Sequence, residues 1–440
     1  MEVRVGDIQN KMRLAEAGQQ ESYWRYVKRQ FRKNKRALLS LNILYGLLFL
    51  FIFADFIANN KPLIAKHEGT LMVPVVKNYL VALGLDKWDH QYLNAQWQNL
   101  DYDFVIFAPI PYSPKQQDVK NTNVAPSGQQ ELRSWRWRHW LGTDGLGRDL
   151  LSAMIHATRI DLSIGVVAMG VATIIGLFLG AFAGFFGDDK IRISLIRLLL
   201  NIPFLYLAWF YAFDVRSEAI SAAAQSGISS LLLQVMLSIL IFMVIMVLPN
   251  LLANLFKKIN FLNYKTSIPI DIIVSRIIEV VLSIPVIFLI IMILAVVQGG
   301  SIFWVMVIIG LTRWTGIARF VRAELLRIRS LEYIEAAKAL GYSNKRILLK
   351  HALPNSLAPV FIAIAFGIAS AILVEAFLSF IGVGVPADVL TWGSLLSEGR
   401  EMPRNWWLAL FPGLAIFITV TIFNLIGEGL TDALDPRLKE

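Results

Sequence analysis

The sequence predicts an all-α polytopic membrane helix bundle, and three observations support this fold class. The 440 residues are 56% hydrophobic and 17% charged, and the mean hydropathy is +0.57, which is too apolar for a soluble domain of this length. Several apolar runs reach the length of about 20 residues that a helix needs to cross a bilayer. There is no cysteine, which excludes disulfides and thiolate metal sites.

Residues 1–36 are expected to form a cytoplasmic, basic, amphipathic segment. Seven cations lie between residues 25 and 36, directly before the first apolar run, namely Arg25, Lys28, Arg29, Arg32, Lys33, Lys35 and Arg36. Aromatic and aliphatic residues recur among them at helical spacing, which indicates an interfacial helix over about residues 21–36. No small-residue cleavage site of a secretory signal peptide follows, so we interpret the segment as a positive-inside anchor.

Eight segments qualify as membrane spans by length and composition. The first is 37–57, and the second, 162–186, carries a face of small residues suited to close helix packing. The glycines of that face are Gly165, Gly170, Gly176, Gly180 and Gly184. The other spans are expected at 195–213, 230–255, 277–297, 301–318, 357–381 and 407–427.

Positive charge in the short loops predicts the orientation of these spans. The loops rich in Lys and Arg are 187–197, 256–276 and 319–355. The loops with few or no cations are 214–229, 298–300 and 382–406. The cation-rich loops and both termini are therefore expected in the cytoplasm. Residues 58–160 then form an external insert, in which turn formers and many aromatic side chains predict a small ordered structure.

A polar, basic stretch interrupts the apolar segments at residues 332–355. The residues that form a spaced motif within it are Glu335, Ala336, Ala337, Gly341, Leu353 and Pro354. We expect Gly341 to cap a first helix with a positive φ, Ser343 to cap a second, and Pro354 to end it. Ala336 and Ala337 would leave a shallow surface for another protein. The stretch contains no catalytic constellation, so it predicts a mechanical coupling element.

This stretch resembles the EAA loop of the transmembrane permease subunits of ABC importers. The segments "HWLGTDGLGRDLLSAMIHATRIDLSIG", "RAELLRIRSLEYIEAAKALGYSNKRILLKHALPN" and "ILVEAFLSFIGVGVPADVLTWGSLLSEGR" look like the oligopeptide/dipeptide/nickel class, specifically its second permease subunit. His351 stands where the family motif has isoleucine, as is common in this class. The segments "NNKPLIAKHEG" and "APIPYSP" resemble the subgroup that imports longer peptides, including microcin C and peptidoglycan-derived peptides.

The resemblance implies a type I ABC importer permease fold in the bacterial cytoplasmic (inner) membrane, with a permease core domain at 161–440. It implies that the chain forms half of the translocation pathway of an ATP-driven peptide importer. The implied ATPase-coupling loop is 319–355, and its coupling residues are Glu335, Ala336, Ala337, Gly341, Leu353 and Pro354. A dipeptide or nickel importer of the same class remains an alternative.

The resemblance also implies the partners of the chain. They are a second permease chain in a heterodimer, ATP-binding cassette subunits and an external substrate-binding protein. ATP and Mg would be bound by the partner ATPase, because the sequence has no GxxxxGK[ST] motif to hold a nucleotide. This chain is therefore expected to be no enzyme and to bind no cofactor or metal.

The sequence departs from the family in the number of its spans. The family has six, whereas eight are expected here, because a pair of spans is inserted at about 191–256. Two added crossings leave the EAA loop on the cytoplasmic side. Since the other six spans match the permease core in order, we expect the inserted pair at the periphery of that core.

Charged residues within the spans are candidates for the translocation path. An ionised side chain there costs on the order of 2.5 to 3.5 kcal/mol unless it is paired or hydrated. Glu375 and Glu279 are the path candidates, although interhelical pairing explains Glu375 equally well. Glu279 and Arg313 could also reach water near the cytoplasmic face. A secondary transporter is a further alternative, but it would need ion-binding charges at mid-membrane.

The expected orientation can be tested by thiol labelling, because the natural chain has no cysteine. We predict that Ser217→Cys and Ser127→Cys react with a membrane-impermeant maleimide added outside intact cells, and that Ser343→Cys does not. Labelling at position 343 from outside would reverse the orientation. Permeabilised cells, in which all three variants should react, provide the control.

Overall fold

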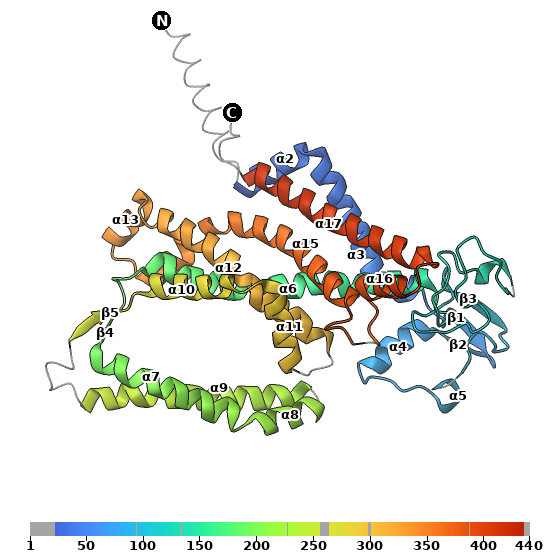
Figure 1. Cartoon of the computed structure of the whole chain (residues 1–440), viewed down its shortest axis with the longest axis horizontal. Coiled ribbons are helices and arrows are strands. Elements are labelled where there is room, and N and C mark those ends of the chain that lie inside the picture. Colours follow the sequence, from blue (N-terminus) through green and yellow to red (C-terminus); the bar gives the residue numbers. More distant parts are fainter. Residues whose placement is uncertain are drawn as a thin grey trace, which may run out of the picture. The chain divides into compact units, whose positions relative to one another are not determined.

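The computed structural model describes residues 23–434, except 94, 133, 227, 256–263, 298–300 and 387. Residues 1–22 of the expected basic segment lie outside the described residues. The chain divides into two compact units. The first comprises Met1–Gly180 and Ile278–Glu440, and the second comprises Ala181–Ile277. Figure 1 shows that helices make up most of both units.

The first unit contains most of the membrane helices. They are α3 (Lys35–Ile57), α11 (Val286–Val297), α12 (Ile302–Ile328), α15 (Ala358–Phe380) and α17 (Trp406–Leu434), with the shorter α2 (Tyr23–Lys33) and α16 (Trp392–Glu401). Two helices, α6 (Leu150–Phe186) and α10 (Ile270–Ser283), cross from one unit into the other. Helix α2 carries the cations expected to form a basic helix, and Asn34 separates it from α3 by capping the latter.

The number of spans agrees with the sequence, but one span is broken. Seven helices are long and apolar enough to cross a membrane, and the pair α10 and α11 makes an eighth if it is counted as one span. Proline within the span expected at 277–297 predicts a kink at Pro285, and the span is indeed broken there, with α10 and α11 bent by 88° at the break between them. Pro285 explains the position of the break, since proline lacks an amide donor and clashes with the preceding helical turn.

Helix α6 begins at Leu150 instead of at residue 162. The polar residues in its first turns, which made this part look external, all have partners. Arg159 Nη1 donates to Asp55 Oδ2 at 2.5 Å, and His156 Nε2 lies 2.9 Å from the carbonyl oxygen of Ala58. These partners allow the helix to continue through the polar stretch, although Oδ1 of Asp161 at its end is buried without a hydrogen-bond partner among the described residues.

Glycines on α6 allow α12 to approach closely. A Cβ atom on Gly176 would lie 2.7 Å from Cβ of Ile317, and one on Gly180 would lie 2.6 Å from the carbonyl oxygen of Ala318. The expected small-residue face is thus confirmed at these two positions. It is wrong at Gly170, where an added Cβ would meet nothing within 4 Å.

The core of this bundle joins four helices. Its buried apolar side chains come from α6, α11, α12 and α15, and they are Ile164, Ala168, Ile290, Val305, Met306, Ile308, Ile309, Ala371 and Leu378. Many large apolar side chains on the outer helix faces remain exposed. An apolar exterior is typical of helices that face lipid or another membrane subunit.

The second unit is built on two packed helical segments. Its elements are β4 (Arg192–Ser194), α7 (Leu195–Trp209), the π-helix η2 (Phe210–Asp214), α8 (Ser217–Ser226), α9 (Ile228–Leu255) and β5 (Lys265–Ser267). Helices α7 and α8 pack on α9, and β4 pairs antiparallel with β5. The expected loop at 214–229 is thus mostly the helix α8. Arg216 Nε donates to Ser238 Oγ of α9 at 3.0 Å.

The insert between α3 and α6 contains a small antiparallel sheet. Its strands β1 (Pro62–His67), β2 (Thr70–Met72) and β3 (Phe104–Phe107) have the order β2-β1-β3, and α4 (Pro74–Ala82) and α5 (His90–Leu93) follow β2. The expected aromatic packing is confirmed here. Tyr92 stacks on Trp97 with ring centroids 5.3 Å apart, and Lys61 Nζ lies 4.5 Å from the centre of the Trp88 ring.

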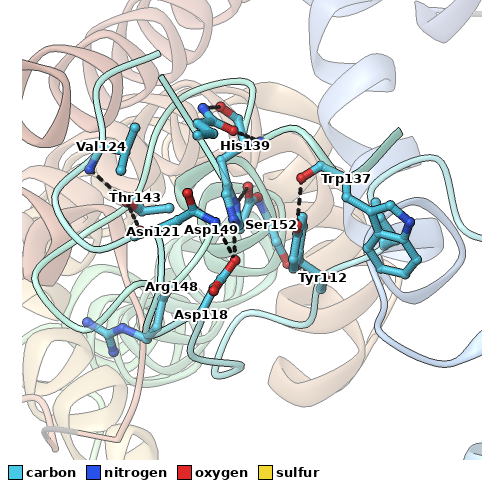
Figure 2. Close-up of polar contacts among 12 residues, drawn as sticks. Tyr112, Asp118, Asn121, Val124, Trp137, His139, Thr143, Arg148, Asp149 and Ser152 are labelled. Atoms are coloured by element: carbon cyan, nitrogen blue, oxygen red, sulfur yellow. Dashed lines mark hydrogen bonds and ion pairs between the residues drawn. The ribbon is translucent and has the colours of Figure 1, made fainter. Parts of the chain in front are cut away.

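A buried polar network connects the insert to the first turn of α6 (Figure 2). His139 lies at its centre, with Nδ1 2.8 Å from Asp149 Oδ2 and Nε2 3.4 Å from Asp118 Oδ2. Asp149 Oδ1 also accepts a hydrogen bond from the amide of Ser152 at 2.7 Å, which caps the start of the helix. His139 therefore helps to fix the loops of the insert to α6, together with the bond from Ser152 Oγ to the carbonyl oxygen of Tyr112 at 2.8 Å.

The charge of Asp118 contributes to this network. Burial raises the pKa of Asp118, but hydrogen bonds from Asn121, His139 and the amide of Lys120 outweigh burial, so its pKa lies below the ordinary value of 3.8. A carboxylate with a lowered pKa in the folded state stabilises the fold above its unfolded pKa. That contribution disappears as the pH falls through the folded pKa.

We therefore predict that acid weakens the insert partly through Asp118. Between pH 6 and pH 3, the thermal midpoint of the purified protein should fall less for Asp118→Asn than for the wild type, since an amide does not titrate. The measurement is tryptophan fluorescence against temperature. Asp101→Asn, at an exposed carboxylate of the same insert, is the control and should keep the wild-type slope. Equal slopes for Asp118→Asn and the wild type would contradict the prediction.

Candidate functional site

The polar stretch after α12 begins with a helix that ends in a glycine cap. Helix α13 (Glu332–Ala339) is followed by Gly341, whose φ is +79°. The amide of Tyr342 donates to the carbonyl oxygen of Ala337 at 3.1 Å, and the amide of Gly341 donates to that of Lys338 at 2.9 Å. This pair of bonds is the Schellman motif, in which the left-handed residue is usually glycine. The expected cap at Gly341 is confirmed.

The second half of the stretch is a short helix that changes its winding. Ser343 Oγ accepts from the amide of Arg346 at 3.4 Å, so the expected N-cap is confirmed. The elements are α14 (Asn344–Arg346), the π-helix η3 (Ile347–Ala352) and the 3-10 turn η4 (Pro354–Ser356). Pro354 begins the 3-10 turn, so the helix ends directly before the Leu-Pro pair, as expected.

One face of this loop packs onto its own chain. The side chains of Ile334, Ala337, Ile347, Leu348 and Ala352 are buried. Ala337 is only 7% exposed, so the expectation that it presents a surface to another protein is wrong. Because Ala336 and Ala337 are neighbours on one helix, about 100° of rotation separates them, and only one of them can face inward.

The opposite face of the loop presents apolar and polar side chains to the exterior. Glu335 and Ala336 are exposed on α13, and Leu340 and Leu349 are 73% and 53% exposed. Of the remaining motif residues, Gly341 and Pro354 are exposed, whereas Leu353 is half-buried.

Side-chain contacts hold the two halves of the loop together. The guanidinium carbon of Arg346 lies 4.3 Å from the centre of the Tyr342 ring, and that ring stacks on His351. Asn355 Nδ2 donates to the carbonyl oxygen of His351 at 2.8 Å and to the hydroxyl of Tyr333 at 3.3 Å. These contacts brace α13 against η3 and η4.

Glu375 lies inside the helix bundle, where it meets an acid that was not among the expected site residues. Its side chain is 0% exposed, and Ser379 Oγ donates to its Oε1 at 2.6 Å. The carboxyl group of Asp161 on α6, also fully buried, lies close to it. Asp161 Oδ2 accepts from the amide of Trp392 at 3.0 Å, at the start of α16. Oδ1 of Asp161 and Oε2 of Glu375 are buried and have no hydrogen-bond partner among the described residues.

The other expected charges are placed apart from this pair. Glu279 is exposed on α10, and Arg313 lies on α12 beside the break between α10 and α11. The sequence did not identify Asp161 as a buried site residue, because a charge directly before an apolar run usually marks the end of a span. Across residues 23–434, with the gaps given above, no cluster of three His, Asp or Glu side chains could hold a metal ion.

Two family models match the chain. Residues 261–440 match the binding-protein-dependent transport system inner membrane component. Residues 22–69 match the N-terminal TM domain of oligopeptide transport permease C. The first match contains the EAA loop together with α15, α16 and α17.

Curated relatives share most of the chain. The dipeptide transport system permease protein DppC of Alkalihalophilus pseudofirmus is 30% identical over 335 residues, which cover 76% of this chain and 81% of the relative. The inner membrane ABC transporter permease protein YejE of Escherichia coli is 26% identical, and the alignment covers 93% of this chain and 95% of the relative. The peptidoglycan transport system permease protein YejE of Agrobacterium fabrum is 26% identical, and the alignment covers 92% of this chain and 91% of the relative.

These matches agree with a helical membrane bundle. The proteins that match are permease subunits, not enzymes. The family model describes the membrane component of a transport system that depends on a binding protein. The chain therefore belongs to the family of transmembrane permease subunits of ATP-driven ABC importers of the peptide class, and it is a multi-pass protein of the inner membrane.

Proposed function

We propose that this chain forms one half of the translocation pathway of a peptide importer, and that the EAA loop couples it to a separate ATPase. The single observation that carries the coupling role is the construction of the loop. One face is fixed to its own chain by buried Ile334 and Ile347, while the other exposes Ala336 and Leu340. A braced element with an unpartnered apolar face suits docking to a soluble subunit.

The coupling would be mechanical. The loop follows α12 without a long linker and leads directly into α15 (Ala358–Phe380). Closure of an ATPase dimer that binds ATP and Mg would move the braced loop, and the loop would move these two helices with it. Such a movement can open the pathway alternately to either side, because packed helices shift as rigid elements. A second permease chain would supply the other half of the pathway in a heterodimer.

The extent of the matches supports longer peptides as the substrate. The DppC relative covers 76% of this chain, whereas the Escherichia coli YejE protein covers 93%. The peptidoglycan transport system permease protein of Agrobacterium fabrum likewise covers 92% of this chain. We therefore infer a substrate among oligopeptides, including peptides derived from peptidoglycan, and not a dipeptide or nickel.

Ala336 provides the direct test of the docking face. We predict that Ala336→Arg lowers peptide-stimulated ATP hydrolysis and co-purification of the ATPase by at least about tenfold, since about 1.4 kcal/mol of lost binding free energy has this effect. Membrane expression should be unchanged. Ala82→Arg, at an exposed alanine of α4, is the matched control. Normal ATPase association of Ala336→Arg would reject the docking face, whereas Ala337→Arg tests packing instead.

Gly341 tests the geometry of the loop separately from its surface. Its φ is +79°, and an added Cβ would meet nothing within 4 Å, so only backbone strain opposes a side chain. We predict that Gly341→Val weakens ATPase association by about 1 kcal/mol or more, roughly fivefold, since non-glycine residues are strained at positive φ. Gly341→Asn should be milder, because asparagine tolerates this conformation. Equal effects of valine and asparagine would show that φ is not the cause.

A further inference from the structure

A cavity of about 350 Å³ lies between α12 and the break that separates α10 from α11. From α12 it is lined by Thr312, Arg313, Thr315, Gly316 and Arg319. From the break it is lined by Val281, Leu282, Ile284, Pro285, Val286 and Leu289. Its volume is at the lower end of the range for small-ligand sites, about 300 to 1,000 Å³.

The cavity contains two cations and no acid. Arg313 and Arg319 line it, while every other lining side chain is uncharged. Nε of Arg313 is buried and has no hydrogen-bond partner among the described residues. Unlike a lysine, an arginine does not lose its proton in a protein. Arg313 therefore stays positively charged within an apolar segment. Only an anion from outside the cavity lining could balance this charge.

The backbone around the cavity also favours an anion. Val286 is the first residue of α11 and lines the cavity, so the positive end of that helix dipole lies beside the two arginines. The 88° bend at Pro285 brings this helix end to the cavity. A straight helix through this position would have kept its amide groups in internal hydrogen bonds.

We propose that this cavity is a carboxylate-binding site, in which the planar guanidinium of Arg313 pairs with a carboxylate presented from outside this chain. Arginine matches a carboxylate with two parallel hydrogen bonds, and Arg319 adds a second positive charge. The inference rests on the proposed function, because a translocated peptide brings a C-terminal carboxylate. An acidic side chain of the partner permease would offer the same chemistry, and the experiment separates the two sources.

The test uses the complete transporter, with its permease partner, ATPase and binding protein, reconstituted in proteoliposomes. Uptake of one peptide is compared in two forms, with a free C-terminal carboxylate and with a C-terminal amide. The binding protein is the same in every sample, so a change in the acid-to-amide uptake ratio upon substitution reports on the permease. The variants are Arg313→Gln, Arg313→Lys and Arg319→Gln. Arg404→Gln, at an exposed arginine outside the cavity, is the charge-matched control.

If the peptide supplies the carboxylate, Arg313→Gln should lower uptake of the free acid by about tenfold or more and leave the amide within about twofold, as expected for a lost charged hydrogen-bond pair. Arg313→Lys should be intermediate, and Arg319→Gln should change the ratio in the same direction by a smaller factor. If the partner permease supplies it, Arg313→Gln should lower both forms equally and reduce co-purification of the partner.

Wild-type uptake of both forms by Arg313→Gln and Arg319→Gln, together with normal assembly, would overturn the site. An increase in thermal stability of Arg313→Gln with unchanged uptake would overturn it as well, since it would show an unpaired charge with no ligand. If the wild-type complex takes up neither form, the proposed peptide function fails. Co-purification then decides the site, because loss of the partner in Arg313→Gln supports it and retention rejects it.

Discussion

The close contact between α6 and α12 is the constraint on which the rest of the bundle depends. Lipid offers no hydrophobic driving force between helices, so association depends on van der Waals packing at short range. Gly176 and Gly180 allow α6 and α12 to approach this closely, because a Cβ atom on either glycine would collide with Ile317 or Ala318. Helix α12 carries both the arginines of the cavity and the EAA loop. The positions of these arginines and of the EAA loop therefore depend on how closely α12 packs against α6.

The loop and the bundle are stabilised by different means, which suits their different tasks. In the bundle, buried Asp161 joins α6 to the start of α16, and buried Glu375 bonds to Ser379 within α15, through hydrogen bonds that a low dielectric strengthens. The loop instead relies on a small apolar core around Ile334 and Ile347, with aromatic contacts at Tyr342. A movement applied to the loop can thus reach α12 and α15 without first disrupting the loop itself.

Much of the helical framework follows from local sequence, whereas contacts between distant segments do not. Cap residues act within a few positions of themselves, so Gly341 and Ser343 could be assigned before the structure was known. Pro285 likewise marked a kink, but the 88° angle depends on what the two halves pack against. Helical spacing shows which residues share one face of a helix, but not what that face contacts. It could therefore not decide which of Ala336 and Ala337 is buried. The meeting of Asp161 with Glu375 joins residues far apart in the chain, and nothing near either residue indicates it.

The length of α6 has a consequence for the insert. The helix is continuous for 37 residues, which corresponds to about 55 Å, whereas a hydrocarbon core is about 30 Å thick. About 25 Å of it therefore extends beyond the apolar layer, and Asp149 and His139 attach the insert to its first turn (Figure 2). Because the insert is attached at the end of α6 that lies beyond the apolar layer, a tilt of α6 within the membrane would displace the insert sideways.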